Sequence, residues 1–115
     1  MIYGNNIAKY VRNNIAKVGP GGWTRLVSAG SVPLPNRQWI KVQAKGRNSL
    51  AIAYTNKNSD GTFTAPTTSA HPWPHYPANT VLTEPVSADV MLWGRCQPKA
   101  GASDGGLRVS VTEFA

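Results

Sequence analysis

Apolar and polar residues alternate with a period of two in several short segments of this chain. The clearest is 38–44, in which Ile40 and Val42 share one face while Trp39 and Lys41 share the other. Successive side chains of a β-strand point to opposite faces of its sheet, so this alternation is typical of a strand that is buried on one side. Three further segments repeat the pattern, namely 49–55, 89–96 and 107–112. The sequence therefore predicts a body built from strands.

Glycine and proline residues separate these segments. The chain has 11 Gly and 9 Pro in 115 residues, and turn signals recur about every ten positions, as in sandwiches and barrels of short strands. We expect a hairpin turn at 45–48 and a short strand at 62–64. Prolines in 65–79 exclude a central strand there, because proline donates no backbone hydrogen bond. The predicted fold is all-β, a small β-sandwich with a jelly-roll-like arrangement; a closed barrel is the alternative.

The first 22 residues have a different pattern. The pentapeptide Asn5–Lys9 returns as Asn13–Lys17. At helical spacing one apolar stripe forms, made of Ile7, Val11, Ile15 and Val18. This stripe fits a basic amphipathic helix, whereas the asparagines and β-branched residues favour an extended strand. We therefore predict an N-terminal arm over 1–22, either a short helix or extended, and a β-sandwich domain over 23–115.

Charge is distributed unevenly along the chain. Residues 1–57 hold nine of the 12 lysine and arginine residues and none of the five carboxylates, and the net charge is +7. Such asymmetry favours a negatively charged partner, which could be nucleic acid, an acidic protein surface or the acidic part of a like subunit. The alternative is that these side chains are solvated and simply keep a basic protein in solution.

No complete catalytic, cofactor-binding or metal-binding set can be assembled from the sequence. His71 and His75 are the two imidazoles, but alternating prolines exclude a helix that would bring them onto one face. With Cys96 as the single cysteine, no disulfide can form within the chain, and we expect this thiol to be buried. No apolar run approaches the roughly 20 residues of a membrane span. We expect no enzyme, no cofactor, no metal and no membrane partner.

One loop has the composition of a ligand-binding loop. Trp73 and Tyr76 lie in a proline-stiffened tract, where flat aromatic rings could stack on a sugar or a base, or anchor in a pocket of a partner. The alternative is that these rings cap the open end of the sandwich. The candidate ligand loop comprises His71, Trp73, His75 and Tyr76.

The order of motifs from Trp23 to Phe114 resembles a known family. A Val32–Arg37 entry leads into a strand at 40–43 and an aliphatic strand at 50–54, and a Tyr76–Thr80 loop precedes the aromatic strand at 90–95. This order resembles small β-sandwich virion proteins of tailed bacteriophages, of the head decoration, cement or fibre-base class. In this chain Ala78-Asn79 stands where the family usually has a glycine.

The resemblance implies a non-enzymatic structural protein of the virion, assembled in the host cytoplasm. It implies binding to the capsid lattice, with the major capsid protein or other virion subunits as partners, commonly as a homo-oligomer and with the N-terminal segment as an arm. The expected apolar and basic contacts of that arm are Ile7, Val11, Ile15, Val18, Lys9, Arg12 and Lys17.

Two other functions are compatible with the residues. Basic side chains interleaved with Trp23, Trp39 and Tyr54 are typical of a small basic barrel that binds nucleic acid. Trp73 and Tyr76 could instead serve a virion domain that binds a carbohydrate or a receptor.

Overall fold

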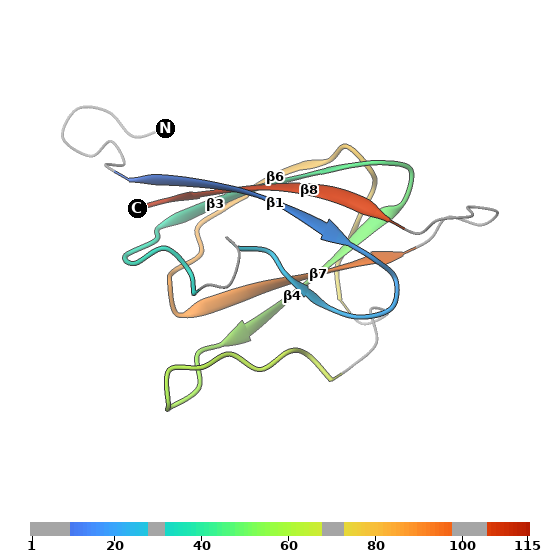
Figure 1. Cartoon of the computed structure of the whole chain (residues 1–115). Coiled ribbons are helices and arrows are strands. Elements are labelled where there is room, and N and C mark those ends of the chain that lie inside the picture. The colour runs from blue at the N-terminus through green and yellow to red at the C-terminus, as the bar shows by residue number, and fades with distance from the viewer. Residues whose placement is uncertain (1–9, 28–31, 68–72, 98–105) are drawn as a thin grey trace.

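Two antiparallel sheets packed face to face make up the protein (Figure 1). The computed structural model describes residues 10–27, 32–67, 73–97 and 106–115. Sheet A consists, in spatial order, of β1 (Val11–Val18), β8 (Leu107–Phe114), β3 (Trp39–Lys45) and β6 (Val81–Glu84). Sheet B consists of β2 (Thr24–Arg25), β7 (Val90–Gln97), β4 (Ser49–Asn56) and β5 (His75–Tyr76). The described residues contain no helix, and the predicted all-β sandwich is confirmed.

The main core lies between the two sheets. Alternate residues of β3 and β8, such as Ile40 and Val109, point toward sheet B, where Leu50, Ile52 and Leu92 meet them. All five side chains are at most 2 % exposed. Removing this apolar surface from water is the main force that holds the layers together. The inward faces predicted for these strands are therefore confirmed.

Sheet B is also covered on its other side. There, Ala53, Met91 and Trp93 form a second apolar cluster with Val27 and Phe63, and two partly buried tryptophans pack against it. The chain after β4 runs beneath sheet B in Figure 1 and carries Phe63 into this cluster. The strand predicted at 62–64 is wrong, because these residues form no ladder and serve as a cover.

The turn predicted at 45–48 is not a hairpin. β3 pairs with β6 and β8, whereas β4 pairs with β5 and β7. The short connection between them therefore crosses from one sheet to the other. Gly46 has a φ of 146°, and a β-carbon there would lie 2.8 Å from the Leu107 side chain, so glycine suits this crossing.

The predicted boundary after residue 22 also needs correction. Residues 11–18 are extended, and β1 pairs with β8 along its whole length. Ala16 and Val18 are buried in the main core, so this tract is an edge strand of the sandwich and not a separable arm. The alternation of its side chains has a period of two, and the ladder to β8 supplies the hydrogen bonds that a helix would have made internally. Residues 1–9 lie outside the described ranges.

A buried ion cluster ties β1 and β8 to the loop before β3. The Glu113 carboxylate, 1 % exposed, accepts hydrogen bonds from Arg12 Nε at 2.8 Å, from Arg37 at 3.0 Å and from the Leu34 amide at 2.8 Å. Arg37 also donates to the carbonyls of Val86 and Ser87 at 3.1 and 2.8 Å. Arg12, which was predicted to contact a partner, has its guanidinium held by Glu113 within the chain, and its side chain is 27 % exposed.

Candidate binding face of sheet A

The outer face of sheet A is the side of the sandwich turned away from sheet B. The apolar cluster described above covers the opposite side of the molecule, so this face is the broad sheet surface that the described chain leaves open to solvent. Its side chains come from alternate positions of β1, β8, β3 and β6, as the burial pattern of each strand shows. Its charged members are Lys17, Lys41, Lys45 and Arg108, and the strand positions on this face hold no carboxylate.

Three of these cations form a row across neighbouring strands. The register places Lys17 opposite Arg108, and Arg108 opposite Lys45. Adjacent strands are about 4.8 Å apart, and like charges directly opposite one another are destabilising. Among the described residues none of the three makes an ion pair; the recorded ion pairs involve Arg12, Arg37 and Lys57. We call Lys17, Arg108 and Lys45 the cation row.

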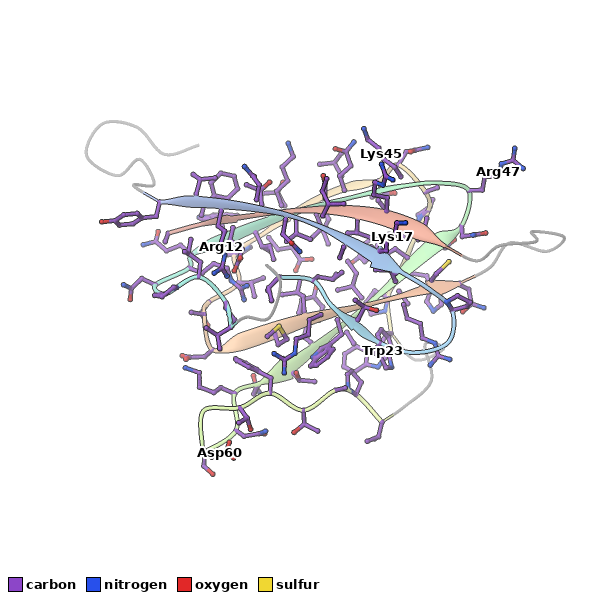
Figure 2. The ribbon with its side chains drawn as sticks, viewed as in Figure 1. Arg12, Lys17, Trp23, Lys45, Arg47 and Asp60 are labelled. Carbon is purple, nitrogen blue, oxygen red and sulfur yellow. The ribbon has the colours of Figure 1, made fainter. Side chains whose placement is uncertain are left out.

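The cation row lies at one end of the molecule. Figure 2 shows Lys45 at that end with Arg47, which follows it in the crossing to sheet B. A surface hollow of about 440 Å³ adjoins the row; it is lined by Lys17, Val18, Gly19, Gly106, Leu107 and Arg108. Two cationic side chains and glycine backbone therefore line this hollow, a combination that suits carboxylate or phosphate groups.

The opposite end of the outer face is apolar. Val11, Phe114 and Trp39 lie side by side on β1, β8 and β3, and Tyr10 immediately precedes β1. Val11 is 54 % exposed, and Ile15, two rows further along and next to the cation row, is 65 % exposed. Apolar side chains gathered on an open sheet face are typical of a surface that binds another macromolecule.

The predicted contact residues of the arm do not all point to the same side of sheet A. Val11, Ile15 and Lys17 point outward on sheet A, whereas Arg12 is turned to Glu113 and Val18 is buried. Ile7 and Lys9 lie outside the described residues. The helical stripe failed to separate these groups because positions four apart also share one face of a strand.

Sequence reasoning did not identify Trp39, Lys45, Phe114 and Arg108 as parts of one face. The signal that was present is the shared parity of Trp39, Lys41 and Lys45, which alternate with buried residues along one strand. Nothing in the sequence shows that β8 lies between β1 and β3. The cation row therefore emerges only from the sheet order.

The candidate ligand loop is only partly open. Trp73 packs against the second apolar cluster, on the outer side of sheet B and not at an open end of the sandwich, and His75 is exposed in β5. Tyr76 packs against the main core beside Tyr54, whose hydroxyl donates to Glu84 Oε1 at 2.7 Å. Burial first, and then Glu84, raise the pKa of both tyrosines above the usual value. His71 lies outside the described residues, so the grouping of all four is not observed.

Other chemistry in the described ranges is sparse. No group of three or more His, Cys, Asp or Glu side chains there could hold a metal ion. Cys96 is buried, as predicted. No helix of the described chain is long and apolar enough to cross a membrane.

Comparison of the chain with protein-family models, with curated proteins and with solved structures finds no match.

Proposed function

We propose that this chain is a non-enzymatic structural virion protein of the capsid decoration or cement type. Its outer face of sheet A binds an acidic surface of the major capsid protein or of a neighbouring virion subunit, and it is located in the virion. The observation that carries the proposal is the cation row, in which Lys17, Arg108 and Lys45 stand in register without a carboxylate. An acidic partner surface would relieve the repulsion among these three side chains, and this relief would favour binding of such a surface.

The two ends of the face would contribute differently to binding. The cation row would steer an acidic surface into place, an effect that extends about 8 Å at physiological ionic strength. Trp39 and Phe114 would then supply the dry contact, since buried aromatic side chains commonly dominate binding energy. Salt should therefore slow association more than it speeds dissociation.

The test uses capsid shells assembled from the major capsid protein of the genome that encodes this chain. The wild-type chain should cosediment with the shells, and electron microscopy should show it on the lattice. A triple variant, Lys17→Gln with Lys45→Gln and Arg108→Gln, should lose most of this binding. Lys57→Gln is the control, because Lys57 pairs with Asp89 away from the face, and it should bind as the wild type does. Equal binding by the triple variant would refute the role of the cation row.

Single-stranded nucleic acid is the second candidate ligand of the same face. Trp39 and Phe114 lie side by side, and Lys41 follows in the next row, so aromatic rings adjoin cations. The strands that flank β3 in this face are β8 and β6. Stacking on aromatic rings beside a positive surface is how many proteins bind single strands without sequence preference.

Fluorescence titration with short oligonucleotides tests this alternative. Affinity should fall steeply between low and physiological salt, because each phosphate contact releases a counterion. Trp39→Ala should weaken binding by about 1–3 kcal/mol, the usual contribution of one stacked base. An absence of binding at low salt would exclude nucleic acid and leave the acidic protein surface.

A further inference from the structure

β1 ends sheet A and leaves one edge of its backbone free. Tyr10 and Ala115, which continue the ladder of β1 and β8, exchange both backbone hydrogen bonds, at 3.4 and 2.9 Å. In an antiparallel ladder such pairs alternate with pairs that point away. The N–H and C=O groups of Val11, Asn13 and Ile15 are therefore directed away from β8. Within the described ranges, no other strand pairs with this edge.

The outward side chains in the first five residues of this edge are uncharged. Natural edge strands are commonly kept apart by short length, proline or charged side chains. β1 has eight residues and no proline. From 11 to 15 its outward side chains are Val11, Asn13 and Ile15, of which the two apolar ones are more than half exposed. The segment is thus suited to accept another strand.

We propose that β1 pairs antiparallel with β1 of a second copy, about a two-fold axis through Asn13. In this register each odd-numbered residue pairs with an odd-numbered residue of the other copy. The outward side chains of the two strands therefore lie on the same face of the joined sheet. Val11 lies opposite the partner's Ile15, and Ile15 lies opposite the partner's Val11. The two sheets A join into one continuous sheet, and the unpaired backbone groups on both edges are satisfied.

The sequence of β1 favours a second copy over an unrelated strand. A two-fold interface must be complementary to itself, and this register places apolar residues on apolar residues and Asn13 on Asn13. The apolar row of Trp39, Phe114 and Val11 then continues into the partner's Ile15. An axis at Ile15 would instead place Val11 opposite Gly19, which has no side chain to contact.

Like charges face one another in this register only beyond the paired segment 11–15, where Lys17 lies opposite position 9 of the partner, a lysine outside the described residues. Lys17 lies four positions from the axis, so the two copies of Lys17 are separated by eight positions, or about 27 Å at 3.4 Å per residue. This separation is well beyond the screening length of about 8 Å at physiological ionic strength. The two cation rows lie at opposite ends of the joined face and stay open to an acidic partner. The pairing does not depend on the proposed virion role.

Sedimentation equilibrium measures the pairing directly. The wild-type chain should reach twice the monomer mass, and Ile15→Lys should remain at the monomer mass. Val81→Lys is the matched control, because Val81 is 50 % exposed on the outer face of β6, at the other edge of sheet A. It should pair as the wild type does. A monomeric wild type at all concentrations, or pairing lost only in Val81→Lys, would overturn the proposal.

A cysteine variant tests the register without weakening the strand. A hydrogen-bonded antiparallel pair has its α-carbons about 5.5 Å apart, within the range that a disulfide spans. Asn13→Cys should therefore form a linked dimer under mild oxidation at least tenfold faster than Val81→Cys, and the buried Cys96 should not compete. Faster linkage of Ile15→Cys than of Asn13→Cys would overturn the register. Equal rates in all three variants would overturn the pairing.

Discussion

The Arg37 side chain shows how a charged residue is accommodated inside this sandwich. It is 2 % exposed, and burial lowers its pKa while the Glu113 carboxylate opposes that effect. Its remaining donors meet backbone carbonyls of Val86, Ser87 and Val90. No buried side-chain nitrogen or oxygen in the described residues lacks a hydrogen-bond partner. The charge is tolerated because every donor that burial removes from water is satisfied again.

Replacing Arg37 with Met should be severely destabilising. The substitution would leave the buried Glu113 carboxylate without one of its partners and the carbonyls of Val86 and Ser87 without donors. Breaking a buried ion pair in this way costs about 3–5 kcal/mol of unfolding free energy, which urea denaturation would measure. Lys41→Met, an exposed position of the outer face that lies between two threonines, is the control and should change stability by less than about 0.5 kcal/mol. A loss below about 1 kcal/mol for Arg37→Met would show that the pair contributes little.

Tyr54 makes stability depend on pH at the alkaline end. Burial and the hydrogen bond to Glu84 raise its pKa above the usual 10.0, so the folded state favours the protonated phenol. This contribution to stability is complete below pH 10, and it is lost as the pH rises toward the pKa of the folded state. Unfolding free energies measured at about pH 8 and about pH 11 should therefore differ less in Tyr54→Phe than in the wild type. An identical decline in both would show that Tyr54 titrates as it does in the unfolded chain.

At the scale of the strands, the sequence predicted which side chains of a strand face the core, but not which strands pair with one another. The inward residues of 38–44 and 107–112 were identified because one side of each strand is buried and the other is open. β4 is buried on both sides, with Ala51 and Ala53 as buried as Leu50 and Ile52, so the burial on one side only that alternation in 49–55 predicted was wrong. Strand pairing depends on contacts between distant segments, and local periodicity holds no information about them. For that reason the sequence indicated a hairpin at 45–48 where the chain changes sheets.

The same limit applied to the candidate site. Lys17, Val11 and Ile15 were identified as contact residues because the charge and apolar pattern of the N-terminal tract is local. Arg108 and Lys45 were not identified as contact residues, because only the strand order β1-β8-β3 brings them beside Lys17. Whether the tract was helix or strand was also undecided, because its apolar spacing fits both and only pairing with β8 selects the strand.

Asn79 adopts a positive φ in the turn that leads into β6. Its φ is 68°, in the left-handed region where glycine is favoured, and its amide donates to the Ala44 carbonyl at 3.0 Å. Asparagine tolerates this conformation better than most residues, so it can occupy a position that otherwise favours glycine.

Asn79→Ala should accordingly lower the unfolding free energy by about 1 kcal/mol, because alanine adopts a positive φ at a cost of about 1–2 kcal/mol. Asn79→Gly should keep the stability of the wild type or raise it slightly. Thermal unfolding of the two variants side by side is the measurement. Equal melting temperatures for alanine and glycine at this position would contradict the explanation.

At the scale of the whole molecule, the outer sides of the two sheets differ in how far they are exposed to solvent. Sheet B is covered by its own chain, whereas sheet A presents an open face with cations at one end and aromatic residues at the other. Three like charges in register lower the stability of the free chain, yet the core and the Glu113 cluster are large enough to tolerate them. Association with an acidic partner, as proposed above, would remove this repulsion.

Arg108→Glu tests this conflict between stability and binding. A glutamate in the middle of the row would convert two repulsive pairs, with Lys17 and Lys45, into attractive ones. Each favourable cross-strand pair contributes roughly 0.2–1 kcal/mol, so the unfolding free energy should rise by about 1 kcal/mol at low salt, and less at high salt. Binding to an acidic shell should fall at the same time. The control is Lys57→Glu, which breaks the 3.4 Å pair with Asp89; it should lower the unfolding free energy slightly and leave binding unchanged. A lower unfolding free energy in Arg108→Glu would mean that the three cations do not repel one another measurably.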